Sequence, residues 1–292
     1  MSCGDNATPE HVFSVDVEEH FHALALERAA PRDLWPGLPS RVEPMTDLLL
    51  DLLARHGATG TFFVVGWVAE RHPDLVRRIA AQGHEVGSHT WWHRRVFSQP
   101  PAEFRDEVRR TRALLQQLSG QPVLGFRAPS FSILPGCEWA LDVLIEAGHR
   151  YDSSFFPIHR PGYGNPGSPP MAHRIERPAG ELVELPMMTL PLLGVRLPAS
   201  GGAYLRHGPY ALTAAALRHC ERAGHAGMLY IHPWEVDTGQ PRFAVPWLTR
   251  VRHYGGLRRT LPLLTRLLSE FRFTSAARRH ASLLDVPVPT RT

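Results

Sequence analysis

The sequence predicts an α/β protein built on a parallel sheet. Up to about residue 152, short apolar segments typical of buried strands alternate with amphipathic helical segments. The 292 residues, of which 43% are hydrophobic and 21% charged, have ordinary globular composition. The sequence shows neither an internal repeat nor a linker. We therefore expect a single domain whose crossover helices connect parallel strands.

The first predicted elements rest on distinct local patterns. Residues 11–16 are an apolar run that ends in an acid, typical of a buried strand. Residues 46–56 place four leucines on one helical face, and Gly57 marks the end of that helix. Residues 59–65 are β-branched and aromatic, as in a strand buried on both faces. The elements expected next are helices at 67–82, 101–118 and 137–147, and strands at 84–88, 123–126 and 149–151.

The second half is less regular. Residues 20–44 and 155–180 are rich in proline and glycine, and only a short helix is expected at the start of the first of these segments. Further strands are predicted at 182–188, 228–231 and 271–275, and helices at 210–222 and within 246–270.

Composition and charge exclude several classes of protein. The net charge is +4, and all 32 basic residues are arginines that acids interrupt, so a nucleic-acid-binding surface is not expected. The apolar runs are too short for a transmembrane segment, and no secretory signal is visible, which predicts a cytoplasmic location. Cys3, Cys137 and Cys220 lie too far apart in sequence to indicate a disulfide framework.

Ionisable side chains follow many of the predicted strands. The carboxyl ends of parallel strands meet at one edge, so these side chains should share one rim. In strand order they are Asp16 and Glu18, His89 and His93, Arg127, Asp152, and His232.

The spacing of these residues indicates a metal site. His89 and His93 are four residues apart, so in a helical backbone they would share one face. A carboxylate would complete the three protein ligands of a catalytic zinc site. Asp16 and Glu18 would point the same way from a continuing strand, so one could bind metal while the other serves as a base. Glu19 remains an alternative ligand.

Arg127 and His232 each have two interpretations. Arg127 could be a surface arginine, or a buried cation that keeps a carboxylate ionised. His232 could be a core histidine, or a catalytic acid placed directly after an apolar strand.

Taken together, these motifs resemble the NodB-type polysaccharide deacetylases, carbohydrate esterase family 4, over about residues 11–232. The matching segments are SVDVEE at 14–19, TGTFFVVG at 59–66, His89-Thr90-Trp91-Trp92-His93, Arg127-Ala128-Pro129 and Leu229-Tyr230-Ile231-His232. The later HPWE, QPRF and RHY segments are similar to the subgroup encoded with exosortase-linked exopolysaccharide clusters.

This resemblance implies a distorted (β/α) barrel of about seven parallel strands. The barrel would occupy residues 11–235, with a helical C-terminal extension at 236–280 packed on it. Residues 1–10 are expected to be a disordered N-terminus, and residues 281–292 a flexible tail.

The resemblance also implies a metal-dependent hydrolysis of N-acetyl groups on an oligosaccharide, a polysaccharide or its lipid-linked precursor. Glu18, His89 and His93 would hold one divalent ion, zinc first, with cobalt or nickel as alternatives. Asp16, supported by Arg127, would act as base and His232 as acid. The Ser130 N–H would stabilise the oxyanion. Trp91 and Trp234 would bind sugar, and Asp152 would orient His232.

Two departures from the family pattern leave alternatives open. Val17 stands where the family usually has a second adjacent aspartate, so the ligand role passes to Glu18. No tryptophan accompanies Asp152. The alternatives are a cyclic-amide or formamide hydrolase on the same fold, and a non-catalytic carbohydrate-binding or assembly protein.

Overall fold

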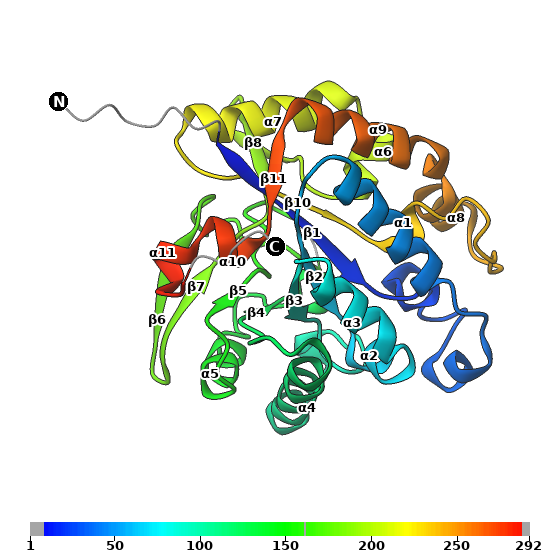
Figure 1. The fold of residues 1–292 in the computed structure, drawn as a ribbon, viewed down its shortest axis with the longest axis horizontal. Helices are drawn as coiled ribbons and strands as arrows, with labels where there is room; N and C mark the ends of the chain where they lie inside the picture. Colours follow the sequence, from blue (N-terminus) through cyan, green and yellow to red (C-terminus); the bar gives the residue numbers. More distant parts are fainter. Residues whose placement is uncertain (1–8, 161, 288–292) are drawn as a thin grey trace.

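The computed structural model describes residues 9–160 and 162–287 (Figure 1). The strands are β1 (Glu10–Val17), β2 (Thr61–Val64), β3 (Glu85–Ser88), β4 (Gly125–Phe126), β5 (Tyr151–Asp152), β6 (His173–Arg177), β7 (Gly180–Glu184), β8 (Thr189–Leu192), β9 (Val195–Pro198), β10 (Met228–Ile231) and β11 (Arg272–Thr274). The helices are α1 (Val42–Arg55), α2 (Gly66–Arg71), α3 (Pro73–Ala81), α4 (Pro101–Ser119), α5 (Trp139–Glu146), α6 (Gly202–His207), α7 (Tyr210–Arg222), α8 (Trp247–Tyr254), α9 (Leu257–Glu270), α10 (Ala276–Arg279) and α11 (Ala281–Leu284).

The main sheet confirms the predicted α/β class. Its strand order is β10-β1-β2-β3-β4-β5-β7-β6, with β11 also paired to β1. The seven strands from β10 to β7 are parallel, and β6 joins β7 antiparallel at the edge. In the described residues no backbone pairing closes β7 onto β10. Side chains reach Met228 of β10 instead: Ser200 Oγ donates to Met228 O, and Ser153 Oγ lies 3.0 Å from Met228 Sδ.

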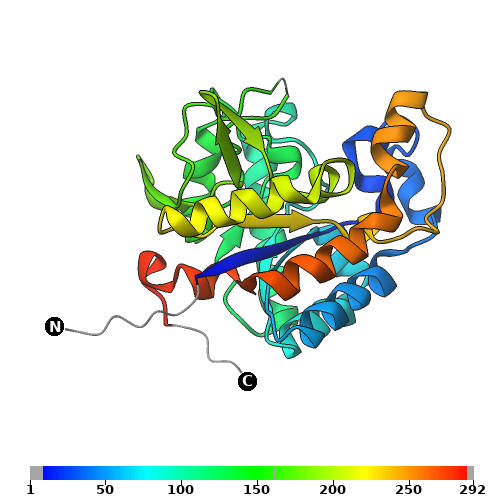
Figure 2. The same ribbon diagram turned by 90° about the horizontal axis from the view of Figure 1, so that it is seen from above.

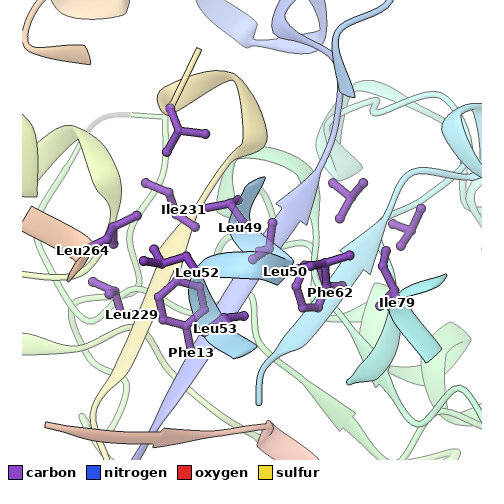
Figure 3. Close-up of a cluster of buried hydrophobic side chains, with 14 of the residues drawn as sticks. Phe13, Leu49, Leu50, Leu52, Leu53, Phe62, Ile79, Leu229, Ile231 and Leu264 are labelled. Carbon is purple, nitrogen blue, oxygen red and sulfur yellow. The ribbon is translucent and has the colours of Figure 1, made fainter. Parts of the chain in front are cut away.

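The largest hydrophobic cluster lies between α1 and the sheet (Figure 3). The leucines of α1 that share one helical face are fully buried and face the aromatic and aliphatic side chains of β1, β2 and β10. Removing one such leucine to alanine costs about 2–5 kcal/mol of stability. This packing holds the carboxyl ends of the strands in place.

Proline and glycine divide two of the predicted helices. Pro73 lacks the N–H needed to continue α2, so the helix expected at 67–82 becomes α2 and α3. Gly256 has φ +71° and separates α8 from α9 within the segment 246–270. Residues 20–37 form three short 3₁₀ turns, at His20–His22, Leu24–Leu26 and Arg32–Gly37.

The strands β6, β8 and β9 were not predicted. Their residues are mostly exposed or half-buried, and β8 and β9 each include a proline, so they lack the continuous apolar pattern of the central strands. The predicted strand at 182–188 overlaps β7, and the predicted last strand at 271–275 is confirmed as β11.

The ends of the chain differ slightly from expectation. β1 already includes Glu10, and residues 1–8 of the predicted disordered segment lie outside the described residues. α11 occupies part of the segment expected to be a flexible tail, with Ala281 and Leu284 buried, while residues 288–292 are also outside the described part. None of the helices that the structure describes is long and apolar enough to cross a membrane.

Candidate active site

The structure brings six predicted residues together at one end of the sheet. They come from the carboxyl ends of β1, β3, β4 and β10 and the loops that follow: Asp16, Glu18, His89, His93, Arg127 and His232. Within this group, Glu18, His89 and His93 each offer a ligand atom within 4.8 Å of the others. His93 Nε2 lies 2.6 Å from Glu18 Oε2.

The surrounding residues bind the atoms of Glu18 and His89 that face away from this group. Trp234 Nε1 donates to Glu18 Oε1 at 2.9 Å, while the buried Glu18 Oε2 faces His93 Nε2. His89 Nδ1 donates to Arg127 O at 2.7 Å, which leaves its Nε2 lone pair available. Two imidazole nitrogens and one carboxylate oxygen are a donor set that suits a divalent cation such as zinc. These residues therefore fit a metal.

The environment shifts the pKa values of Glu18 and His89 in the direction that metal binding needs. Burial raises the pKa of Glu18, but the neighbouring His93 and His232 outweigh it and bring that pKa well below its usual range. Burial lowers the pKa of His89 to about 4. A neutral imidazole and an ionised carboxylate are the forms that coordinate metal.

The backbone between the two histidines is not helical, so a turn and not a shared helical face brings them together. Residues 89–95 form a tight turn in which Thr90 and His93 adopt left-handed backbone angles, with φ +59° and +53°. Glu107 of α4 holds this turn, because its Oε2 accepts the backbone N–H groups of Trp91 and Trp92, both at 3.2 Å. The turn brings the imidazole centroids of His89 and His93 to 5.1 Å. Strained backbone of this kind is common at functional sites.

Glu18 and Glu19 point in opposite directions, as the strand period predicts. Glu19 is also buried, but its carboxylate accepts hydrogen bonds from Ser40 Oγ and from Arg41 N, the latter at 3.0 Å. Glu19 thus anchors the loop that leads into α1. This arrangement favours Glu18 as the acidic ligand.

Asp16 and Arg127 form a buried ion pair beside the metal-binding group. Arg127 NH1 lies 2.6 Å from Asp16 Oδ1, and the guanidinium is fully buried. The other guanidinium nitrogens donate to the backbone O and the Oγ of Ser153, at 3.1 and 3.0 Å, while the Phe63 ring lies 4.2 Å from the guanidinium carbon. A charge-assisted hydrogen bond of this length stabilises the ionised carboxylate.

Glu235, and not Asp152, accepts the hydrogen bond of His232. His232 Nδ1 lies 2.9 Å from Glu235 Oε2, and Arg206 of α6 pairs with Glu235 Oε1. This fixes Nδ1 as the donor, so His232 Nε2 faces Asp16 Oδ2 at 3.8 Å and Glu18 Oε1 at 3.7 Å. A side chain at Gly202 would lie 2.3 Å from Glu235 Oε2, so glycine leaves room for the carboxylate. Sequence reasoning missed Glu235, although its i,i+3 spacing from His232 was a usable signal.

Asp152 instead forms a buried pair with a second acidic residue, Glu184. It occupies the position opposite Glu184 on the neighbouring strand, and its Oδ1 accepts a hydrogen bond from Ser154 Oγ at 2.6 Å. Burial raises the pKa of Asp152 to about 6, and burial together with Asp152 raises the pKa of Glu184 well above its usual range.

The predicted sugar-binding tryptophans lie in the interior. Trp91 is 2% exposed, and Arg110 stacks over its ring. Trp234 is 7% exposed and lies between the rings of His232 and His253, at 4.9 and 4.4 Å. Neither tryptophan offers an open ring face to a sugar. Trp234 instead donates a hydrogen bond to Glu18.

A cavity of about 330 Å³ opens beside the metal-binding group. Its walls include His93, Ser130, His22 and Trp35, with the latter two rings 4.2 Å apart. Ser130 has φ +54°, a left-handed conformation. His22 Nε2 is buried without a hydrogen-bond partner among the described residues. Sequence reasoning missed His22 and Trp35, which lie in a segment without regular periodicity.

The comparisons with known families divide the chain into two parts. Residues 35–150 match the family model described as polysaccharide deacetylase, and residues 153–281 match one described as a domain of unknown function (DUF3473). The chain is 35% identical over 98 residues to a peptidoglycan-N-acetylglucosamine deacetylase of Bacillus cereus, covering 33% of this chain and 36% of the relative. It is 45% identical over 60 residues to a chitooligosaccharide deacetylase of Bradyrhizobium sp., covering 20% of this chain and 27% of the relative. The chain thus matches only a minor share of these relatives' length.

Two solved structures share the fold over nearly the whole chain. A protein from Mycobacterium smegmatis named "putative polysaccharide deacetylase" superposes with a TM-score of 0.63 at 20% identity, covering 100% of this chain and 96% of that one. PuuE allantoinase superposes with a TM-score of 0.60 at 17% identity, covering 96% of each chain. At these identities the likeness concerns the fold alone.

Proposed function

Because the chain belongs, through residues 35–150, to the polysaccharide deacetylase family, we propose that it is a metal-dependent hydrolase that removes N-acetyl groups from amino sugars. One observation carries the proposal. Glu18, which groups with His89 and His93, lies 3.7 Å from His232 Nε2, and the same nitrogen lies 3.8 Å from Asp16 Oδ2. This arrangement combines a metal site with a base and an acid.

Neighbouring side chains hold one atom of the proposed base, Asp16, and one atom of the proposed acid, His232. A divalent cation bound by Glu18, His89 and His93 would polarise the amide carbonyl and make water more acidic. Asp16, with Oδ1 held by Arg127, has Oδ2 free to take the proton of the attacking water. His232 keeps its Nδ1–H on Glu235, and in its doubly protonated form it would give the Nε2 proton to the leaving amine when the C–N bond breaks. The products are acetate and a free amino sugar.

The substrate proposal rests on the relatives and on the cavity. The similar curated proteins are named for deacetylation of peptidoglycan N-acetylglucosamine and of chitooligosaccharides. The cavity beside His93 and Ser130 would seat the acetylated sugar, with the Ser130 N–H near the oxyanion. We propose a polysaccharide or its lipid-linked precursor as the substrate; the exosortase-associated subgroup and a cytoplasmic location stay predictions.

Acetate release tests the proposal directly. The protein is stripped of metal with a chelator, reloaded with Zn²⁺, Co²⁺ or Ni²⁺, and incubated with chitooligosaccharides. We expect acetate only after reloading. Acetate release that is indifferent to metal would contradict the metal-dependent mechanism. Oligosaccharide binding without acetate would indicate a non-catalytic binding protein, and turnover of allantoin in its place would indicate a cyclic-amide hydrolase.

A further inference from the structure

Helix α8 presents apolar side chains to solvent. Trp247 is 71% exposed, and Leu248 and Val251 are 54% and 51% exposed. Trp247 and Val251 are four residues apart and share one face of the helix. α8 is anchored to the rest of the protein at its C-terminal end, where His253 and Tyr254 are buried. Large apolar side chains gathered on one exposed helix face mark an interaction surface.

The chain around this face is basic and contains no acid. Residues 238–269 include six arginines and neither aspartate nor glutamate. Arg250, Arg252 and Arg258 are exposed, and no carboxylate in the described part of the chain forms an ion pair with them. The apolar face of α8 is therefore bordered by unneutralised positive charge.

This combination identifies the partner by its chemistry. A second copy of the chain would bring two such basic surfaces together without a carboxylate between them, which electrostatic repulsion opposes. At the surface of an anionic membrane, tryptophan and aliphatic side chains enter the headgroup region while arginines contact the phosphates. We propose that α8 docks the protein on a membrane surface that contains anionic phospholipids.

Docking through α8 would also bring the active site to the membrane. His253 on the inner face of α8 stacks on Trp234 at 4.4 Å, and Trp234 donates to Glu18. Figure 2 shows α8 and the 3₁₀ turns of residues 20–37 at the same end of the molecule, toward which β1 points. This step rests on the proposed function: a saccharide carried on a membrane lipid would be presented to the site from that side.

Vesicle flotation tests the docking surface without any measurement of activity. The protein is mixed with vesicles of phosphatidylcholine alone, or of phosphatidylcholine and phosphatidylglycerol. We expect wild-type protein to float only with the mixed vesicles, and less so as salt rises. The double variants Trp247→Ser/Leu248→Ser and Arg250→Gln/Arg252→Gln should each lower the partition coefficient about ten-fold or more, since each buried apolar group and each arginine contributes a several-fold factor.

Matched controls keep the test specific. Leu193→Ser removes a side chain that is 94% exposed on the β8–β9 turn, and Arg55→Gln removes an exposed arginine of α1; both should float like the wild type. Circular dichroism confirms that every variant is folded.

Three results would overturn the proposal: the wild type does not float, it floats equally with both kinds of vesicle, or the α8 double variants float as well as the wild type. A dimer that Trp247→Ser/Leu248→Ser dissolves, without flotation, would assign the face to a second copy. Acetate release from soluble oligosaccharides is measured separately, so failure there leaves the docking result intact.

Discussion

Trp234 donates its indole N–H to Glu18 Oε1 at 2.9 Å, so a side chain that follows β10 fixes a carboxylate that follows β1. The indole is itself held between two imidazole rings. The position of Glu18, the proposed acidic ligand, therefore depends on β10 as well as on β1.

We predict that Trp234→Phe weakens metal binding. Phenylalanine keeps much of the ring stacking but cannot donate to Glu18, and loss of a hydrogen bond to a ligand costs about 10- to 100-fold in metal affinity. Competition with a zinc chelator measures the change. Trp139→Phe on α5 is the control and should bind zinc like the wild type; equal affinity in both variants would refute the role of the indole.

Glu18 and Glu19 should respond differently to truncation. Glu18→Ala removes a ligand and should lose stoichiometric zinc. Glu19→Ala should retain zinc but lower the free energy of unfolding by about 1–3 kcal/mol, because Arg41 N and Ser40 Oγ lose their acceptor. Zinc content and urea denaturation decide it. If Glu19→Ala lost zinc while Glu18→Ala retained it, Glu19 and not Glu18 would be the acidic ligand.

Asp16 should be separable from the ligands by a double-mutant cycle. Asp16→Asn keeps the size of the side chain but cannot take a proton, so it should bind zinc and lose on the order of 10²–10⁴-fold in rate. Arg127→Met should slow acetate release in the wild-type background, and much less when Asp16 is already replaced, since groups that act as a unit are not additive. If the rate losses of the two single variants simply added in the double variant, Asp16 and Arg127 would not act as a unit. Zinc content is measured for all four proteins.

Glu235 should act through His232 rather than on substrate. Glu235→Gln weakens the acceptor of the Nδ1 proton and, by analogy with other oriented histidines, should slow cleavage of an N-acetyl sugar about 10- to 100-fold. Hydrolysis of 4-nitrophenyl acetate should fall much less, because its leaving group needs no proton. Glu221→Gln, at the separate His11–Glu221 pair, is the matched control. An equal loss on both substrates would assign Glu235 a purely structural role.

The Asp152–Glu184 pair makes stability depend on pH. Each carboxyl has a folded pKa raised above its unfolded value, so its contribution to stability is complete below about pH 4 and is lost as the pH rises through the folded pKa. Glu184→Gln cannot ionise. Its free energy of unfolding, relative to wild type, should therefore rise between pH 5 and pH 8 by about 1 kcal/mol or more. Urea denaturation at both values measures this, and exposed Glu176→Gln should show no such trend.

Much of the fold and the metal group could be predicted because they are encoded locally. The central strands are buried on both faces, so their apolar runs are unambiguous, and their carboxyl ends placed Asp16, Glu18, His89 and His232 on one rim. The turn at residues 89–95 could not be predicted, because it depends on Glu107 from a helix that follows in the chain.

Side-chain partners that are distant in sequence were also beyond prediction. The orientation of His232 involves Arg206 through Glu235, and the burial of Trp91 follows from its packing against Gly66 and Arg110. Aromatic residues near a site therefore give no indication, from sequence alone, of whether they face substrate or the interior.

The pairing of β1 determines when the site can form as the chain leaves the ribosome. β1 precedes all its partners in the chain, and two of the three, β10 and β11, come from the last quarter of the sequence. Until residue 234 has emerged, the edge of β1 that pairs with β10 stays open and Glu18 lacks its partner Trp234. The start of the other edge stays unpaired until residue 274 has emerged. Contacts this distant in sequence slow folding and leave strand edges open to aggregation. Truncation before β11 should therefore yield a chain that chaperones retain rather than a smaller active enzyme.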